Sequence, residues 1–420
     1  MTASERGFAA LVATQALSAF NTNMLRAALL TLAAFRPLDT GGLSRETVVA
    51  LSTLFIVAPY VVLSLPAGRL ADRLPKARLL QTVKTIEIGV FLIAAAGLST
   101  GNLTLLLAAI LLAGICAASF GPAKFGIIPE LLPVSALVRG NAWISASSTL
   151  AILGGLITGN LLALSPTGLQ ATQLTLVGIA VIGWLTSLAI PATPAPLPLL
   201  SLSPRAFSAD FLDSVARLRT LPAIVLPVLG CSWFWFQGAL TTSLIPLYVA
   251  DTQTLPESAV SLLLIATSLG VTVGAIAAHL LSQRRVPAPA WLGGIALAIT
   301  ALPGLDLWLA GTIAGQAGLW RALADIALVS AGCGLFVVPL GTAVQQLTPA
   351  GERARFVGIN HTFNGLAMVL AGAGLLLLNA PMVSPSALFA ASAIISGGVA
   401  ALTMIKTWPA LLLARKGTSQ

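Results

Sequence analysis

Long apolar runs, separated by short polar stretches, follow one another along almost the whole chain. About 20 consecutive apolar residues in an α-helix cross the hydrocarbon core of a bilayer. The runs are continuous, whereas the strands of a lipid-facing barrel alternate between apolar and polar residues. The pattern therefore predicts an all-α membrane protein with twelve transmembrane helices. The predicted spans are residues 8–35, 48–67, 79–99, 102–121, 139–164, 171–191, 222–250, 257–281, 289–303, 321–347, 355–380 and 385–407.

Composition supports the same class of protein. Of the 420 residues, 57% are hydrophobic and only 8% are charged, whereas soluble domains average about 45–50% apolar and about 25% charged residues. Cys116, Cys231 and Cys333 each lie within an apolar run and lack the spacing of metal ligands, which indicates packing residues. We therefore expect neither a metal ion nor a cofactor.

The distribution of positive charge predicts the orientation of the chain. The formal net charge is +9, which in a soluble protein would suggest binding to nucleic acid. Successive spans cross the membrane in alternating directions, which places most Lys and Arg residues on one side of it. Cytoplasmic loops of membrane proteins are rich in these residues. We therefore expect both termini in the cytoplasm and no nucleic-acid partner.

The spans form two groups of six on either side of a stretch rich in Pro and Ser. We expect an N-terminal six-helix bundle at residues 1–191, a cytoplasmic linker at 192–221 and a C-terminal six-helix bundle at 222–420. Apolar and charged positions of the linker separate onto opposite helix faces, which predicts a short amphipathic helix on the inner membrane surface. Some positions recur in both halves, as in a parallel transporter repeat. They include Pro122 with Pro339 and Arg139 with Arg355.

The densest group of charges lies between the second and third spans, in the stretch Gly68-Arg69-Leu70-Ala71-Asp72-Arg73-Leu74-Pro75-Lys76-Ala77-Arg78. So many charges, with a Gly and a Pro, are unsuited to hydrocarbon. The stretch therefore predicts a short cytoplasmic turn that fixes the orientation of the neighbouring spans. An ordinary positively charged loop with no further role is the simpler alternative.

Polar side chains also occur inside the first span. Charged residues within a span are costly in lipid and usually mark a functional pathway. Asn21, Thr22 and Asn23 precede Arg26, and Asn23 and Arg26 share a helix face because they are three residues apart. Arg26 has no acidic residue within one turn along the sequence. We therefore expect its guanidinium to bind an anion.

The third span carries Lys84 and Glu87, which are also three residues apart. These side chains are candidates to bind a polar head group from a cavity. Alternatively, they form an ion pair that satisfies itself and lets the helix enter the membrane. The sequence leaves both interpretations open.

The stretch that follows the fourth span, residues 120–130, contains two prolines, Pro122 and Pro129. Proline removes a backbone hydrogen bond, so we expect the helix to break twice here. Lys124 and Glu130 would then lie at the cytoplasmic boundary. A cation and an acid at this boundary are candidates to contact a charged substrate.

The eleventh span carries Asn360, His361 and Asn364. These side chains either line a cavity or form a hydrogen-bonded cluster in the interior. The sequence does not separate the two.

Two further features lie in the second half. The aromatic run 233–236, followed by Gln237, suits a helix that faces lipid, a lipid tail or a packing partner. Asp325 is an acid near the outer end of the tenth span, and Arg321 one turn earlier is its expected partner. We assign Asp325 no role.

Four segments carry a family pattern: Ala19-Phe20-Asn21-Thr22-Asn23 with Arg26, the charged loop ending in Lys76-Ala77-Arg78, Val83-Lys84-Thr85-Ile86-Glu87-Ile88, and Phe120-Gly121-Pro122-Ala123-Lys124-Phe125. Together they resemble the lysophospholipid transporter branch of the major facilitator superfamily. The resemblance implies twelve transmembrane helices in two six-helix bundles. One position departs from the pattern, because Thr22 stands where the family usually has an acid.

The resemblance also implies roles for these residues. Gly68 would allow close helix contact, and Asp72 would latch the cytoplasmic gate beside Arg139 or beside Arg353 and Arg355. The expected gating residues are Gly68, Asp72, Arg73, Lys76, Arg78, Arg139, Arg353 and Arg355. The expected substrate-binding residues are Asn21, Thr22, Asn23, Arg26, Lys84, Glu87, Lys124, Glu130, Asn360, His361 and Asn364.

The function implied is transport rather than enzymatic catalysis. A protein of the bacterial inner membrane would move lysophospholipids, such as lysophosphatidylethanolamine, to the cytoplasmic leaflet by alternating access. Membrane lipids and a separate lysophospholipid acyltransferase are the expected partners. The residues fit, since a phosphate needs cations such as Arg26, Lys84 and Lys124, and an ammonium needs acids such as Glu87 and Glu130.

Two other functions are alternatives to this one. The same fold would suit an efflux carrier for small amphiphilic compounds or drugs. A lipid-modifying enzyme is disfavoured because the sequence shows no acyltransferase motif, nucleophile or metal set.

Overall fold

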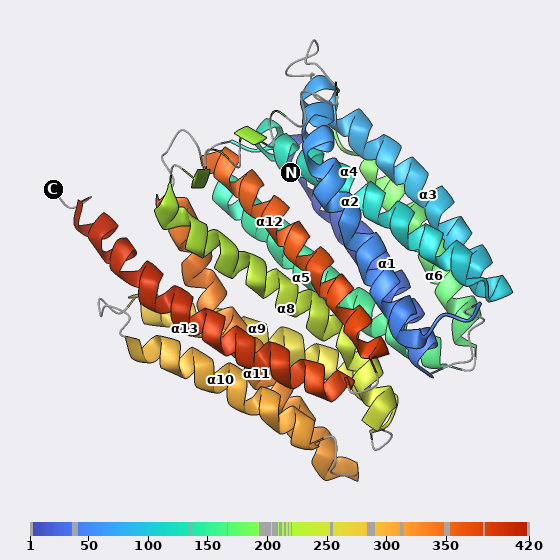
Figure 1. Cartoon of the computed structure of the whole chain (residues 1–420). Coiled ribbons are helices and arrows are strands. Elements are labelled where there is room, and N and C mark those ends of the chain that lie inside the picture. The colour runs from blue at the N-terminus through green and yellow to red at the C-terminus, as the bar shows by residue number, and fades with distance from the viewer. Residues whose placement is uncertain are drawn as a thin grey trace. The chain divides into compact units, whose positions relative to one another are not determined.

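The computed structural model shows a chain built from long α-helices (Figure 1). It describes residues 3–35, 41–133, 136–165, 167–192, 221–252, 255–283, 290–310, 315–347, 353–380 and 383–417, with single positions between 203 and 219. The helices are α1 (Ala3–Phe35), α2 (Arg45–Arg73), α3 (Lys76–Thr100), α4 (Leu103–Leu131), α5 (Leu137–Leu164), α6 (Gly168–Ser187), α8 (Pro222–Thr252), α9 (Ala259–Gln283), α10 (Ala290–Ala310), α11 (Gly315–Leu347), α12 (Arg353–Gly374), the short 3₁₀-helix η3 (Leu375–Asn379) and α13 (Pro385–Gly417).

Most of these helices have the length and composition of membrane spans. Within the described residues, ten segments are long and apolar enough to cross a membrane, and α1 is not among them. α10 contributes a shorter apolar segment, Ile299–Leu309. The prediction of an all-helical, multi-pass membrane protein is therefore confirmed.

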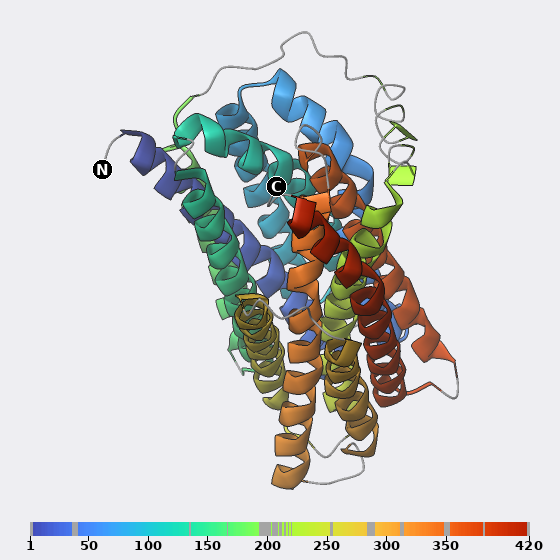
Figure 2. The same ribbon diagram turned by 90° about the vertical axis from the view of Figure 1, so that its left-hand side faces the viewer.

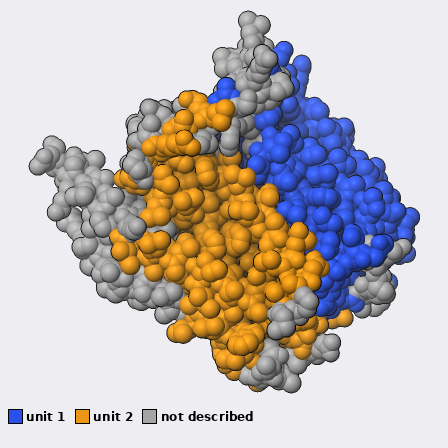
Figure 3. Space-filling model, viewed as in Figure 1, with its two compact units in different colours: residues 1–211 blue, residues 212–420 orange. Residues whose placement is uncertain are grey.

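The chain divides into two compact units, Met1–Phe211 and Leu212–Gln420 (Figure 3). The first unit contains α1 to α6 and the second contains α8 to α13. Most of the predicted linker at 192–221 lies outside the described residues. Its amphipathic helix and the predicted domain bounds therefore stay predictions.

Helix pairing is repeated in the two units (Figures 1 and 2). In the first unit α1 packs against α5 and α6, α3 packs against α4 and α6, and α2 packs against α4. In the second unit α8 packs against α12 and α13, α10 packs against α11 and α13, and α9 packs against α11. Each helix thus has a counterpart in the other unit with equivalent neighbours. This is the pattern of a parallel internal repeat.

Local sequence explains how consecutive helices are joined. Gly101 ends α3 with a φ of 65°, a left-handed conformation that glycine adopts without strain. Asn102 then caps α4 by accepting a hydrogen bond from the backbone N–H of Leu105. Ser44 caps α2 in the same way, accepting from Thr47. These short caps allow adjacent helices to run antiparallel with few linking residues.

The predicted breaks at Pro122 and Pro129 are wrong, because α4 continues through both prolines to Leu131. A proline removes one backbone hydrogen bond, but neighbouring helices compensate for this loss in membrane proteins. Ala123 and Ile127, which lie between the two prolines, are fully buried. Packing on both sides of Pro122 therefore holds the segment helical and overrides its local preference.

Glycines allow several helix pairs to approach closely. On α5, a Cβ at Gly155 or Gly159 would collide with backbone carbonyl oxygens of α1, those of Phe20 and Met24. Small residues at such contacts are the usual basis of helix association in membranes, because they bring backbones into van der Waals contact. The second unit has the same kind of close contact, since a Cβ at Gly274 of α9 would collide with the carbonyl oxygen of a residue in α11.

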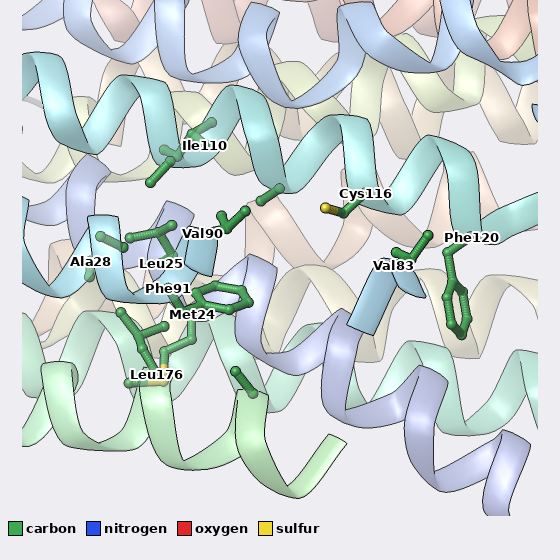
Figure 4. Packing of buried hydrophobic residues seen from close by; sticks show 14 of the residues in the cluster. Met24, Leu25, Ala28, Val83, Val90, Phe91, Ile110, Cys116, Phe120 and Leu176 are labelled. Carbon is green, nitrogen blue, oxygen red and sulfur yellow. The ribbon is translucent and has the colours of Figure 1, made fainter. Parts of the chain in front are cut away.

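The first unit has a continuous apolar core, shown in close-up in Figure 4. α1 contributes Met24 and Leu25, α3 contributes Phe91, α4 contributes Ile110 and α6 contributes Leu176, and all five side chains are buried. The three cysteines of the chain are also buried and unpaired with each other. This agrees with their prediction as packing residues.

Candidate functional site

Arg26 lies in the C-terminal half of α1 and is buried, with a relative exposure of 8%. Its Nη2 donates a hydrogen bond to Thr53 Oγ1 of α2 at 3.4 Å. Thr53 in turn donates its hydroxyl hydrogen to the Val49 carbonyl at 2.9 Å, so its oxygen is oriented to accept from Arg26. The guanidinium is thereby held against α2 at a depth where a positive charge is costly.

The polar residues that precede Arg26 point to different neighbours. Asn21 is buried, and its Nδ2 donates to the Leu176 carbonyl of α6 at 2.8 Å. Asn23 is half-buried and donates to the Ala19 carbonyl of its own helix at 2.8 Å. Thr22 is half-buried as well. Asn21 therefore ties α1 to α6, whereas Thr22 and Asn23 belong to the same side of α1 as Arg26.

Lys84 and Glu87 form an ion pair within α3, with side-chain exposures of 1% and 3%. Ser18 of α1 donates a hydrogen bond to Glu87 Oε1 at 2.6 Å, while Lys84 Nζ donates to the other carboxylate oxygen. On α6, a Cβ at Gly183 would lie only 3.1 Å from Lys84 Nζ. These contacts enclose the pair among α1, α3 and α6, which favours the self-contained ion pair. A role in head-group binding stays a prediction.

Lys76 at the start of α3 forms an ion pair with Glu130 near the end of α4, with Nζ and Oε1 2.6 Å apart. The Lys76 side chain is buried, and its stem passes close to Gly126, where a Cβ would lie 2.9 Å from Lys76 Cε. Lys76 was expected among the gating residues and Glu130 among the substrate-binding residues. The structure joins them in one contact that fastens the charged loop to α4.

Lys124 lies on the same part of α4 and is half-buried. Its ammonium group stands 4.7 Å from the ring centroid of Phe125, which is exposed. Such a cation–π contact stabilises the charge without neutralising it. Lys124 thus remains available to an anionic group.

The structure says less about the remaining gating candidates. A Cβ at Gly68 would meet no described atom within 4 Å, and the close helix contact expected there stays a prediction. Arg73 and Arg78 are exposed. The latch at Asp72 stays a prediction. The side chains of Asp72, Arg139, Arg353, Arg355 and His361 lie outside the described part of the chain.

In the second unit, Asn364 of α12 accepts a hydrogen bond from Ser232 of α8 at 3.1 Å. Asn364 is buried and Asn360, one turn earlier, is half-buried. This hydrogen bond favours the interior hydrogen-bonded cluster over the cavity lining, the two interpretations of these residues that the sequence left open. Substrate binding by Asn360 and Asn364 stays a prediction.

The aromatic run of α8 does not face a single direction. Trp233 Nε1 donates to Ser396 Oγ of α13 at 2.9 Å, and Ser396 donates to Gln237 Oε1 at 3.2 Å. Trp233 also stacks on Phe236 with a centroid distance of 4.7 Å. Trp235, by contrast, is exposed. Most of the run therefore packs inside the unit, and Trp235 is the residue that suits lipid.

The partner expected for Arg321 was wrong. Arg321 of α11 pairs with Asp306 of α10 rather than with Asp325: its Nε donates to Asp306 Oδ2 at 2.6 Å and its Nη2 donates to the other oxygen. Sequence reasoning missed Asp306 altogether. The position of Asp306 in the sequence could have identified it as the partner. Asp306 and Arg321 lie at nearly equal distances from the connection between two antiparallel helices, which brings them to the same level.

The first unit places buried cations on α1 and α3 and a half-buried cation, Lys124, on α4. Cations of this kind bind anionic oxygens such as those of a phosphate. Among the described residues there is no group of three or more His, Cys, Asp or Glu side chains that could hold a metal ion. The arrangement suits recognition of a charged ligand.

Curated relatives match most of the chain. The proteins named lysophospholipid transporter LplT from Serratia proteamaculans, Pectobacterium carotovorum and Escherichia coli O7:K1 are 28%, 29% and 30% identical to it. Each alignment covers 81% of this chain and 80%, 78% and 80% of the relative, respectively.

Solved transporters share the fold. The structure is similar to that of a D-xylose–proton symporter, with a TM-score of 0.71 at 14% identity and 96% coverage of both chains. It is also similar to a bacterial homologue of the human lysosomal transporter Spinster, with a TM-score of 0.64 at 13% identity, covering 99% of this chain and 96% of the other. The model of the Major Facilitator Superfamily matches residues 11–372. The chain therefore belongs to the Major Facilitator Superfamily.

Proposed function

We propose that this protein carries lysophospholipid across the bacterial inner membrane by alternating access. The relatives named lysophospholipid transporter support this substrate, because the similarity extends over about four-fifths of both chains. The repeated helix pairing supports an architecture of twelve transmembrane helices in two six-helix bundles. The direction of net movement in the proposal is toward the cytoplasmic leaflet, where a separate acyltransferase would consume the substrate.

The observation that carries the proposal is the burial of the Arg26 guanidinium within α1, a long helix that packs against α5 and α6. Placing a charge at this depth is costly, so its retention requires a function that uses it. A guanidinium binds two phosphate oxygens at once, whereas an ammonium acts as a point charge. We assign Arg26 as the phosphate anchor, with Thr22 and Asn23 on the same side of α1 as further contacts.

The charged loop supports the proposed topology. Cytoplasmic loops are rich in Lys and Arg, so we infer that the loop before α3 and both termini face the cytoplasm. The Lys76–Glu130 pair would keep this loop fixed against α4 while other parts of the gate move. Asp72 is proposed as the latch of that gate, since a carboxylate is stabilised beside arginine.

The experiment uses purified protein in liposomes and a fluorescent lysophosphatidylethanolamine, with no ion gradient. Accessibility of the label to a membrane-impermeant quencher reports movement between leaflets. We expect transport by the unmodified protein, weaker transport by Arg26→Lys and at least about tenfold weaker transport by Arg26→Gln, equivalent to about 1.4 kcal/mol. Arg6→Gln is the matched control, because Arg6 lies on the same helix but is exposed.

The outcomes separate the proposal from its alternatives. A drug carrier would leave lysophospholipid movement at the level of empty liposomes and would show no order between the two Arg26 variants. Soluble glycerophosphoethanolamine should compete for the site if Arg26 binds the phosphate. Transport at the unmodified rate by correctly inserted Arg26→Gln protein would refute the anchor.

A further inference from the structure

The second unit contains a group of charged side chains that the proposed transport mechanism does not use. It lies where α10 ends and α11 begins. Asp306 of α10 and Arg321 of α11 form a two-bond ion pair, and their side chains are 30% and 39% exposed. Water therefore reaches this pair. Asp325 lies one turn deeper along α11 and is only 6% exposed.

Asp325 differs from its neighbours because part of its carboxyl group is unsatisfied. Its Oδ2 is buried and has no hydrogen-bond partner among the described residues. Arg321 lies one turn before Asp325 on the same face of α11, so its ion pair with Asp306 stands beside Asp325. An ionised carboxylate with a buried, unpartnered oxygen is costly, and binding of a proton removes that cost.

The charges around the group lead to the same conclusion. Two ionised carboxylates beside the single guanidinium of Arg321 would leave one negative charge uncompensated at a buried position. Such a charge is costly, and a carboxyl group avoids the cost by binding a proton. One proton on the pair formed by Asp306 and Asp325 makes the three groups neutral together.

Neighbouring helices supply no further cation. α8 contributes Tyr248, whose hydroxyl donates to the Leu307 carbonyl at 3.3 Å, and Asp251, which is exposed at the end of the helix. α13 contributes the ring of Phe389, at 5.8 Å from that of Tyr248. The sequences of α8, α9 and α10 contain no Lys or Arg, and those of α12 and α13 carry theirs at the opposite end. Arg321 is thus the basic group that faces both carboxyls.

Exposed tryptophans indicate the depth of the group in the membrane. Trp308 lies two residues after Asp306, Trp320 directly precedes Arg321, and both side chains are largely exposed. Tryptophan concentrates at the boundary between lipid and water. The ion pair therefore lies near this boundary, and Asp325 lies one turn below it, at about 6 Å along the helix axis.

We propose that Asp325 and Asp306 form a proton-binding site in the second unit, and that Arg321 closes it toward water. The proton passes between bulk water and the Asp325 carboxylate when the Arg321–Asp306 pair opens, and it converts that carboxylate to a neutral acid. Binding of the proton does not depend on the identity of the substrate. Its coupling to transport, so that a proton gradient changes the rate of lysophospholipid movement, rests on the proposed function.

Infrared spectroscopy of the full chain in lipid nanodiscs tests the site directly. A protonated carboxylic acid has a C=O stretching band that a carboxylate lacks. We expect this band near neutral pH, its loss on titration with base, and its absence in Asp325→Asn. Asp251→Asn is the matched control, because it removes an exposed acid at the same end of the unit. Retention of the neutral-pH band by folded Asp325→Asn protein would overturn the site.

A second variant tests the site even if Asp325→Asn does not fold. Arg321→Gln removes the cation that keeps the pair partly ionised, so the band should persist to higher pH, by about one pH unit or more. An unchanged titration in this variant would contradict the arrangement.

Transport measured in liposomes with an imposed pH gradient tests the coupling. We expect the rate of lysophospholipid movement to change severalfold with the gradient in the unmodified protein and to be insensitive to it in Asp325→Asn. A normal infrared band with gradient-insensitive transport would refute the coupling alone. A normal band with no lysophospholipid movement at any pH would instead refute the proposed function.

Discussion

Lys84 and Glu87 provide the sharpest test of how a charge is accommodated inside this protein. The pair is almost fully buried, and its carboxylate also accepts a hydrogen bond from Ser18. Removing one partner of a buried ion pair leaves an isolated charge, which typically costs about 3–5 kcal/mol. Removing both charges is often close to neutral. Variants that lose one charge should therefore be strongly destabilised, and the variant that loses both charges should not.

The substitutions are chosen to preserve shape. Lys84→Met keeps an unbranched side chain where Gly183 leaves little room, and Glu87→Gln keeps an oxygen that accepts from Ser18. Each single variant should lower the free energy of unfolding by about 3–5 kcal/mol, out of a total that is typically about 5–15 kcal/mol. The double variant should lie within about 1 kcal/mol of the unmodified protein, which gives a coupling energy of about 5 kcal/mol or more.

Unfolding in mixed micelles of detergent and denaturing surfactant, followed by tryptophan fluorescence, measures these differences. Thr85→Met is the control, because Thr85 is exposed on the same helix. If the loss in the double variant equals the sum of the losses in the single variants, the two charges are not coupled and the reasoning fails. Transport by the stable double variant then decides the role of the pair. Full activity supports a structural ion pair, and lost activity supports head-group binding.

Two further predictions follow from packing and hydrogen bonding. Gly155→Ala should lower the free energy of unfolding by about 1–3 kcal/mol because its Cβ would collide with a carbonyl oxygen of α1, while Gly178→Ala, in open space, should be neutral or slightly stabilising in the same unfolding assay. Equal effects at the two glycines would contradict the close helix contact. Trp233→Phe should cost about 1 kcal/mol through loss of the hydrogen bond to Ser396, and Trp235→Phe, at an exposed position, should cost less than half of that. A larger loss for Trp235→Phe than for Trp233→Phe would show that Trp235, rather than Trp233, packs inside the unit.

The same logic explains why buried polar groups mark both structure and function in this chain. Asn21 is buried and Trp233 is half-buried, and each donates a hydrogen bond to a neighbouring helix, at 2.8 and 2.9 Å respectively. Arg26 is a buried cation, and Asp325 is a buried acid with one oxygen that has no hydrogen-bond partner among the described residues. The proposals therefore rest on ionisable groups rather than on polarity alone, since a buried charge in lipid costs much more than a satisfied amide.

Several features of the protein were determined by sequence alone. Continuous apolar runs specify membrane-spanning helices because the backbone must satisfy its own hydrogen bonds in lipid. The connection at Gly101 and Asn102 is equally local, since one residue supplies a left-handed conformation and the next a side-chain cap. The motifs around Asn21, Arg26 and the charged loop also led to the correct superfamily.

Other features depended on tertiary structure. Pro122 and Pro129 predicted breaks that do not occur, because packing of α4 outweighs one lost hydrogen bond at each position. The partners of Lys76 and Arg321 could not be read from spacing within one helix, since Glu130 and Asp306 lie on neighbouring helices. Sequence periodicity reports which residues share a helix face. Which charges meet across helices is decided only when the helices pack.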